Sequence, residues 1–209
     1  MALAPQIDLR PYFQILADIE GPFDWQEYFG NDRPVEVEVG AGRGLFLFNE
    51  GLRRPDSNFL GIEINYREGR RAALRVAKRE MSNVRFLGGD AKVVLGERIA
   101  SASVAGVHVY FPDPWWKRRH KPRRVFDQVL VEHIRRILIP GGKLHFWTDV
   151  KEYFDVAVKM VDEHPAFDPR TTPPERSPEN DMDYHTSFER KKRKLGLPIF
   201  RAQWCKLEE

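Results

Sequence analysis

The sequence predicts an α/β protein built on a mostly parallel β-sheet with helices on both faces. Three observations lead to this prediction. Short apolar, β-branched segments alternate with segments of helical periodicity along the middle of the chain, and this alternation is typical of parallel sheets covered by helices. A glycine-rich turn at 40–44 joins the first of these strands to the first of these helices. The last segment, 199–206, alternates like a strand and is expected to form an antiparallel edge.

The chain has 209 residues, which suits one domain with a small appendage. We divide it into an N-terminal lead-in over residues 1–34 and a single domain over residues 35–209. Apolar residues make up 42% of the chain, enough for a hydrophobic core. The first residues lack the pattern of a signal peptide, and no run approaches about 18 apolar residues. We therefore expect a cytoplasmic protein without a membrane segment.

The numbers and spacing of cysteine and histidine argue against a disulfide and against a metal site. One cysteine excludes an internal disulfide and favours a reducing compartment. The six histidines show no spacing typical of metal ligands, so we predict no bound metal. The sequence is compatible with a monomer and with a homodimer.

Five strands and four helices are expected in the middle of the chain. The strand over 104–110 is nearly all apolar, which is typical of a central strand. The strands are expected at 35–39, 58–64, 84–87, 104–110 and 143–148. The helices are expected at 44–53, 66–81, 125–138 and 150–163, and Asp149 is expected to cap the last.

The C-terminal part changes in character. Five of the fifteen prolines lie between His164 and Pro178, which predicts a loop over about 164–185. We expect this loop to bring Thr186–Glu189 to the functional site. A further strand around Ala166–Thr171 is predicted to pair with 199–206.

The charge is distributed unevenly. Residues 1–66 hold 11 acidic and 5 basic residues, while residues 67–209 hold 20 acidic and 29 basic ones, within a total of only +3. The basic residues are concentrated at Lys117–Arg124 and Arg190–Lys194. This asymmetry predicts a surface that faces a polyanion, built from the later part of the chain.

The glycine loop Gly40-x-Gly42-x-Gly44 allows a ligand to approach the backbone, because glycine has no Cβ. NAD, FAD and S-adenosylmethionine are all open on this pattern. No Gly-Lys-Ser/Thr follows, which excludes a nucleoside-triphosphate loop. Three details favour S-adenosylmethionine: the G-x-G-x-G spacing, the acid Glu38, which would repel a pyrophosphate and attract an ammonium, and Glu63, which can accept both ribose hydroxyls. Asp90 ends the third strand, placed to meet an adenine edge.

The fourth strand runs into the most informative stretch, 111–124. Two prolines flank Asp113 and make the turn rigid at the carboxyl end of the strand. Trp115 and Trp116 offer stacking faces, and six of the eight residues over Lys117–Arg124 are basic. Aromatic residues beside basic ones are what an RNA base and its phosphates would meet.

This stretch and the glycine loop resemble the bacterial tRNA (guanine-N7)-methyltransferase family, whose signature reads F-P-D-P-W-x-K-x-R-H-x-K-R-R after an E-x-G-x-G-x-G loop. Thr148-Asp149 after the fifth strand also follows the family, and 186–189 resembles its T-K-F-E. The chain departs at Pro122 and Ser187, where the family has lysine. The resemblance covers about residues 35 to 206. The matches in the signature are Phe111, Pro112, Asp113, Pro114, Trp115, Lys117, Arg119, His120, Arg123 and Arg124.

The resemblance implies a single Rossmann-like class I methyltransferase domain with a seven-stranded sheet. It implies transfer of a methyl group from S-adenosylmethionine to N7 of guanine 46 in the tRNA variable loop, which yields 7-methylguanosine and S-adenosylhomocysteine. The implied cofactor residues are Glu38, Gly40, Gly42, Gly44, Glu63, Asp90, Ala91 and Asp113. The implied substrate residues are Lys117, Arg119, His120, Arg123, Arg124, Asp149, Thr186, Ser187, Phe188 and Glu189.

Guanine N7 carries a lone pair and no proton, so its alkylation needs no general base. Most of the catalysis can then come from holding N7 in line with the methyl group. We assign to Asp113 the catalytic role of stabilising the positive charge that develops on the base, with Asp149 as the second candidate. Two alternatives remain open: a methyltransferase that acts on the amino group of adenine, and a non-catalytic RNA-binding relative.

Overall fold

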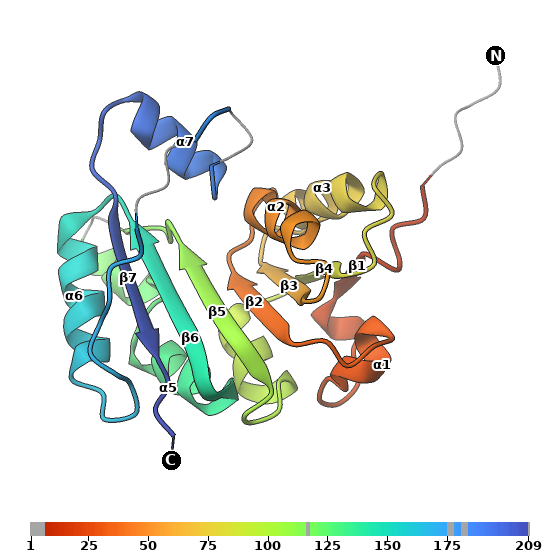
Figure 1. Ribbon diagram of the computed structural model, residues 1–209, viewed down its shortest axis with the longest axis horizontal. Helices are drawn as coiled ribbons and strands as arrows, with labels where there is room; N and C mark the ends of the chain where they lie inside the picture. Colours follow the sequence, from red (N-terminus) through yellow and green to blue (C-terminus); the bar gives the residue numbers. More distant parts are fainter. Residues whose placement is uncertain (1–6, 116–117, 175–177, 181–183, 209) are drawn as a thin grey trace.

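The computed structural model describes residues 7–115, 118–174, 178–180 and 184–208, and this part of the chain forms one sheet of seven strands (Figure 1). The strands are β1 (Phe13–Ile15), β2 (Val35–Val39), β3 (Asn58–Glu63), β4 (Val84–Gly88), β5 (Val104–Tyr110), β6 (Leu138–Thr148) and β7 (Phe200–Cys205). Their order is β1-β4-β3-β2-β5-β6-β7, and every neighbouring pair is parallel except β6 and β7. The predicted parallel sheet with an antiparallel C-terminal edge is therefore confirmed.

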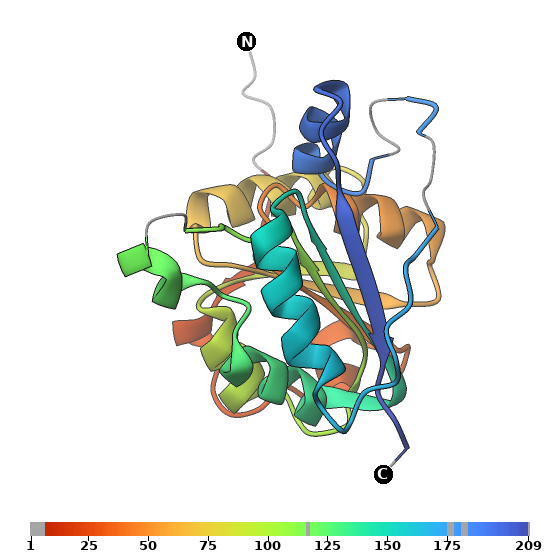
Figure 2. The ribbon, with the colours of Figure 1, turned by 90° about the vertical axis from the view of Figure 1, so that its left-hand side faces the viewer.

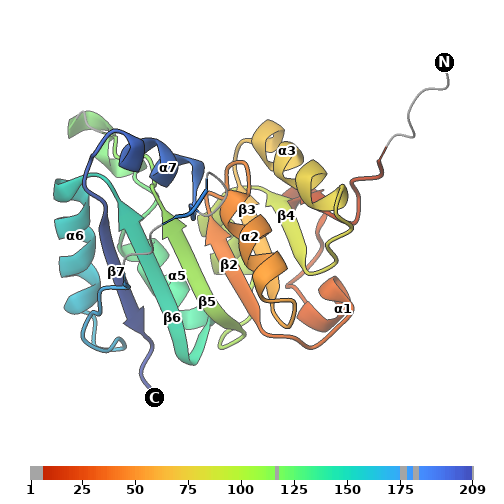
Figure 3. The same ribbon diagram turned by 45° about the horizontal axis from the view of Figure 1, so that its top comes forward.

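Helices pack on both faces of this sheet. They are α1 (Trp25–Phe29), α2 (Leu45–Arg53), α3 (Tyr66–Ala77), α4 (Ala91–Val93), α5 (Gln128–Ile137), α6 (Lys151–Asp162) and α7 (Ser187–Lys194), with short helical turns at Leu16–Asp18, Val94–Arg98 and Arg118–Arg123. Figures 1 and 3 show α2 and α3 on one face, over β2, β3 and β4, and α5 and α6 on the opposite face. Leu47 and Val76 of the first pair bury apolar surface against Phe86, and Ile134 of α5 does so in a second cluster with Val107.

The seventh strand comes from the N-terminal lead-in, where the sequence pattern predicts no strand. β1 runs parallel to β4, with Phe13 opposite Phe86. The segment around Ala166–Thr171 pairs antiparallel with the last strand as predicted, through bridges at Phe167 and Thr171, but these bridges are isolated and the predicted continuous strand is wrong. Prolines within and beside the segment lack the N–H group that a continuous ladder requires.

Local capping explains where two helices begin. α5 begins later than predicted because the Oδ1 of Asp127 accepts a hydrogen bond from the N–H of Leu130 (3.0 Å), which fixes the first turn. The prediction that Asp149 caps α6 is wrong. Val150 takes the cap position without a side-chain bond, and its own N–H donates to Oγ1 of Thr148 (3.2 Å). The carboxylate of Asp149 is thus used elsewhere, as described below.

Half of one sheet face carries no helix of the described part of the chain. On the side of α2 and α3, the strands β5, β6 and β7 lie uncovered by helices (Figures 1 and 3). α7 stands beyond the carboxyl ends of the parallel strands, as Figure 2 shows. Within the described residues, every helix is too short or too polar to cross a membrane.

The lead-in strand is expected to belong to the stable fold. Phe13 is 9% exposed and its ring lies where Gly69 and Gly88 leave room for it. Phe13→Ala should lower the free energy of unfolding in urea by about 3 kcal/mol, because truncation leaves a cavity. The control Phe188→Ala removes a ring that is 61% exposed and should cost less than about 0.5 kcal/mol. Equal, small losses would mean that β1 adds nothing to the fold.

Candidate functional site

The carboxyl ends of β2 to β6 meet at one edge of the sheet, the edge at which ligands bind in such folds. Two neighbouring cavities open there. The first, here called the acid cavity, has a volume of about 400 Å³, and the second, here called the α7 cavity, has about 480 Å³. Of the predicted cofactor residues, the acid cavity is lined by Gly40, Gly42, Glu63, Asp90, Ala91 and Asp113. The α7 cavity is lined by Glu38, Gly40, Gly42, Thr186, Ser187, Phe188 and Lys191, among others.

The glycine loop is held against the end of β3. The N–H groups of Gly40 and Ala41 both donate to the carbonyl of Ile62 (2.9 and 3.0 Å). Gly40, Gly42 and Gly44 all have positive φ, between 53° and 76°. Gly44 lines neither cavity. A Cβ at this position would lie 2.5 Å from the ring of Phe86, so Gly44 serves helix packing and the other two glycines border the cavities.

Glu63 is fixed by backbone donors at the mouth of the acid cavity. Its Oε2 accepts from the N–H of Gly42, and its Oε1 from the N–H of Asn65, both at 2.8 Å. Asp90 also caps a helix, since its Oδ1 accepts from the N–H of Lys92 (2.8 Å). These acids are therefore held in place, and their remaining lone pairs face a cavity that has room for ligand hydroxyl and amino groups.

Glu38 is the most unusual of the acids. Its side chain is almost fully buried, with 3% of the residue exposed, and its Oε2 has no hydrogen-bond partner. Burial, together with the nearby carboxylate of Glu63, raises the pKa of Glu38 well above its ordinary value. A cationic ligand group would relieve both effects. S-adenosylmethionine carries an ammonium and a sulfonium, so the acids of this edge fit that cofactor.

The backbone of the turn after β5 is strained. The sequence does not reveal this strain. Phe111 and Trp115 both have positive φ, 49° and 43°, which is uncommon for bulky residues. The N–H of Phe111 donates to the carbonyl of Trp147 (2.8 Å), so β6 holds the turn. Asp113 stands exposed between these two positions and lines the acid cavity. Tyr110 and Phe111 line both cavities, although neither is among the site residues predicted from the sequence.

The basic segment divides into surface and interior residues. Arg123 lies over the ring of Trp115, 5.2 Å from its centroid, and lines the acid cavity. Arg119 is exposed and donates to the ring of His120 (3.2 Å). Arg124 is buried; its Nε donates to the carbonyl of Pro114 (2.8 Å), so it supports the turn from inside. Trp116 and the predicted substrate residue Lys117 lie outside the described residues.

The segment 186–189 builds the start of α7. Oγ1 of Thr186 accepts from the N–H of Glu189 (3.0 Å), and Oε2 of Glu189 accepts from the N–H of His185 (2.6 Å). This reciprocal arrangement resembles a capping box. Oε1 of Glu189 accepts from Arg193 (2.8 Å). Thr186 and Glu189 thus fix the helix, while Phe188 stays 61% exposed and lines both cavities.

Asp149 is bound by a cation of the same helix. Nζ of Lys192 lies 2.6 Å from Oδ2 of Asp149, and both side chains are partly buried, at 27% and 21% exposure. This ion pair joins α7 to the end of β6. Asp149 and Glu189, two acids that the family resemblance assigns to the substrate, are therefore both paired with basic residues of α7.

A metal site is not formed by the described part of the chain, in which His, Cys, Asp and Glu side chains form no group of three able to hold an ion. The polar groups described at this edge are carboxylates, backbone N–H groups and basic side chains. Such a row of acids at the strand ends suits a ligand with positive charge and hydroxyl groups.

Comparison with solved structures identifies the fold. The aminoglycoside resistance methyltransferase NpmB1 superposes with a TM-score of 0.57 over 87% of this chain and 93% of its own, at 17% identity. This likeness shows the fold alone. The fold is the class I methyltransferase fold, Rossmann-like with one antiparallel edge pair.

Sequence comparison narrows the class to a family. A family model described as "Putative methyltransferase" matches residues 32–202. A tRNA (guanine-N(7)-)-methyltransferase of Rhodopirellula baltica is 43% identical over 97% of this chain and 77% of its own length. One from Aliivibrio fischeri is 36% identical over 87% of this chain and 76% of its own. The chain belongs to the tRNA (guanine-N7)-methyltransferase family.

Glu38 should cost stability in the absence of a ligand. Because its pKa is raised by folding, the folded chain holds a proton that the unfolded chain releases, so stability falls as pH rises above the ordinary pKa. Glu38→Gln should remove this decline and raise the unfolding free energy at neutral pH by about 1–3 kcal/mol. The exposed Glu97→Gln serves as control. Urea unfolding across pH measures both; a decline of unchanged slope in Glu38→Gln would contradict this role.

Lys192 should anchor α7. Lys192→Gln removes the ion pair with Asp149, so amide hydrogen exchange within Ser187–Lys194 should become about 5- to 30-fold faster. Lys151→Gln is the matched control, because Lys151 pairs with Asp155 on the exposed side of α6. Exchange rates in α7 that do not differ between the two variants would show that other contacts hold the helix.

Proposed function

We propose that this protein transfers a methyl group from S-adenosylmethionine to N7 of guanine 46 in the variable loop of tRNA. The observation that carries the proposal is the meeting of Glu63, Asp90 and Asp113 in one cavity beside the buried, unpartnered carboxylate of Glu38. Membership of the tRNA (guanine-N7)-methyltransferase family supports the substrate and the position of the methyl group. tRNA processing and a single cysteine fit a cytoplasmic enzyme.

The acids have distinct proposed tasks toward the cofactor. When bound, S-adenosylmethionine supplies a methyl group on a positively charged sulfur. Glu38 receives the ammonium of its methionine part, since a buried carboxylate gains most from a fixed cation. Glu63 accepts the ribose hydroxyls with the lone pairs that its two backbone bonds leave. Asp90 and Ala91 border the adenine at the start of α4.

The transfer itself requires little chemistry from side chains. N7 of guanine has a lone pair and no proton, so no base has to remove one, and the activated methyl group needs no metal. Holding N7 in line with the methyl group can contribute up to about 7–11 kcal/mol in favourable cases. Positive charge develops on the base, and the carboxylate of Asp113, held by prolines at the cavity, stabilises it.

Asp149 is the proposed second contact to the guanine. Its carboxylate accepts from Lys192 before RNA binds, and a carboxylate is a good acceptor for the N1–H and amino group of guanine. Thr186, Ser187 and Phe188 line the α7 cavity, whereas Asp149 and the buried Glu189 line neither cavity and are joined to them through α7. Of these, Ser187 and Phe188 line the α7 cavity without taking part in the capping bonds of α7, so they are the ones free to meet the base.

RNA phosphates are proposed to bind at the basic segment and α7. Arg119 is exposed, and Arg123 combines a charge with a ring face at Trp115. A folded tRNA is recognised mainly through its backbone and shape, while the target base is splayed out. Lys117 and His120 complete the proposed contacts, and Arg124 contributes by holding the turn in place.

Tritium transfer from labelled S-adenosylmethionine to unmodified tRNA, followed by nucleoside analysis, tests this function. We expect 7-methylguanosine, and its loss when guanine 46 is replaced. Asp113→Ala should lower kcat by about 10²-fold or more, while the exposed Asp56→Ala should not. Label in N6-methyladenosine, or none in any nucleoside, would contradict the proposed function. A wild-type kcat in Asp113→Ala would contradict only the role of Asp113.

A further inference from the structure

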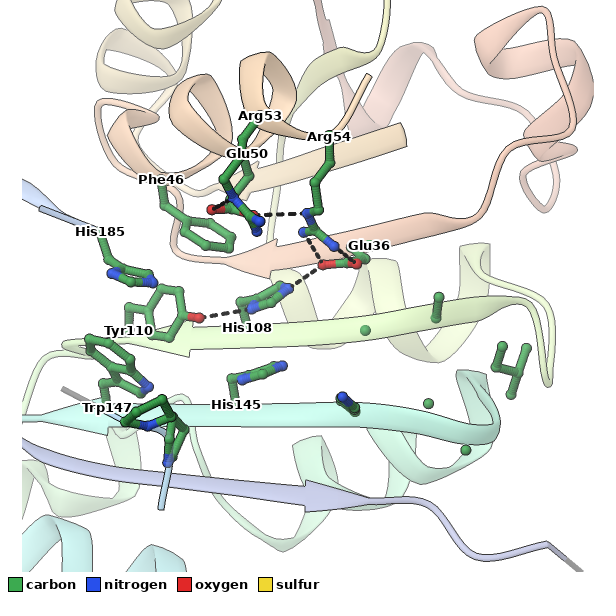
Figure 4. A pocket seen from close by; sticks show the side chains of 18 of the residues that line it. Glu36, Phe46, Glu50, Arg53, Arg54, His108, Tyr110, His145, Trp147 and His185 are labelled. Carbon is green, nitrogen blue, oxygen red and sulfur yellow. Dashed lines mark hydrogen bonds and ion pairs between the residues drawn. The ribbon is translucent and has the colours of Figure 1, made fainter. Parts of the chain in front are cut away.

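A third cavity lies outside the site described above, on the half of the sheet face that carries no helix. It has a volume of about 820 Å³ and is lined by residues of β5, β6 and α2 and by Pro173 and Pro174. Figure 4 shows its charged side chains and its rings. We call it the histidine groove. Its floor is formed by small residues at one end and by rings at the other, notably His108, Tyr110, His145, Trp147 and His185.

The charges in the wall of the groove are balanced internally. Glu36 accepts two bonds from Arg54 (2.5 and 2.8 Å) and one from Nε2 of His108 (2.7 Å). Glu50 is paired with Arg53 and Arg54. Although burial raises the pKa of Glu36, its bonds with His108 and Arg54 lower it well below the ordinary value. Both acids that line the groove thus have cationic partners.

Positive charge remains at the rim. Lys143 is exposed, and the side chain of Arg53 is 57% exposed even while it contacts Glu50. The acids of the groove do not oppose an anion there, because they are already engaged. The rim of the groove therefore suits a phosphate group.

The rings pack against one another; His145 and His185 are the partly exposed ones, and Trp147 carries a donor without an acceptor in the described part of the chain. His108 and His145 stack at 4.6 Å with an interplanar angle of 14°. The centroid of Trp147 lies 4.6 Å from that of His185 and 5.3 Å from that of Tyr110. Trp147 is 4% exposed, and its Nε1–H has no acceptor among the described residues. A buried unpaired donor is costly, and a ligand carbonyl at the groove would satisfy it.

The groove adjoins the candidate site. Tyr110 lines the groove and both cavities at the strand ends. Its OH is hydrogen-bonded to Nδ1 of His108 (2.9 Å), which ties the shared wall to the network of Glu36. His185, at the end of the groove, directly precedes Thr186, the cap of α7. A chain that enters the site along α7 would pass the mouth of the groove.

We propose that the histidine groove binds a nucleotide that flanks the methylated guanosine in the RNA substrate. Its base stacks on the partly exposed rings of His185 and His145, with a base carbonyl accepting from Nε1 of Trp147, and its phosphate lies toward Lys143 and Arg53. Stacking on aromatic faces tolerates any base and is typical of single-stranded RNA sites. The inference rests on the proposed function, because it takes RNA as the substrate.

Two variants with one control test the groove in the full chain. Trp147→Phe keeps a ring and removes the N–H, and it should weaken tRNA binding about threefold to tenfold. Lys143→Gln changes only an exposed side chain and should flatten the salt dependence of tRNA affinity by about 0.7–0.9 in log–log slope. Lys159→Gln, an exposed lysine on α6 away from the groove, should leave both unchanged. Wild-type affinity and slope in both groove variants would overturn the proposal.

Further measurements distinguish a failure of the groove proposal from a failure of the proposed function. Calorimetric binding of S-adenosylmethionine and kcat at saturating tRNA should stay at wild-type values in the control Lys159→Gln, whose side chain lies outside the groove and both cavities. If wild-type protein fails to methylate tRNA, the proposed function fails. If it methylates tRNA and the groove variants bind tRNA normally, only the groove proposal fails. Uridine monophosphate tests the other source of a nucleotide: micromolar binding that Trp147→Phe removes, with tRNA affinity unchanged, would contradict the RNA assignment.

Crosslinking locates the flanking nucleotide directly. tRNA carrying 5-bromouridine beside position 46 is irradiated with the wild-type protein and S-adenosylhomocysteine, and the attached peptides are identified by mass spectrometry. We expect attachment at Trp147 or His185. Crosslinks confined to the basic segment 118–124 would place the flanking nucleotides outside the groove and overturn the proposal.

Discussion

The unpaired carboxylate of Glu38 is the constraint on which the site depends. The fold buries this group at the end of β2, beside Glu63 and without a hydrogen bond at Oε2. A buried acid without a partner costs stability, and nothing in the packing of the sheet calls for it. A bound cation would offset this cost. The burial that raises the pKa of Glu38 also strengthens the attraction between its carboxylate and a fixed positive charge.

The other polar groups are prepared in a different way. Glu63 is held by two backbone N–H groups, Asp149 by Lys192, and Glu189 by Arg193. Each is in position before any ligand arrives, so binding need not order them. The pairs with α7 also mean that the helix carrying Phe188 is positioned by the acids that the substrate would meet. RNA phosphates near Lys192 and Arg193 would compete for those basic groups and link backbone binding to recognition of the base.

The sequence predicts the parts of this arrangement that depend on local patterns. The strand over 104–110, the glycine loop and the acids at the strand ends follow from periodicity and spacing, and the described structure contains them. β1 is missed because three residues carry no readable alternation. The predicted capping role of Asp149 is wrong because a capping residue and an ion-pair partner look alike in a sequence that does not show the position of Lys192. The histidine groove joins β2, β5, β6 and α2, so no single segment reveals it.

We propose that the carboxylate of Glu38 binds a positively charged group of S-adenosylmethionine. Calorimetry of cofactor binding in buffers of different ionisation enthalpy, between about pH 5 and 8, measures the protons exchanged. Because the pKa of Glu38 is raised in the free protein, binding should release protons from the wild-type protein, and Glu38→Gln should bind weakly and release none. Tight binding with no proton release from the wild-type protein, or an equal release from Glu38→Gln, would contradict the claim.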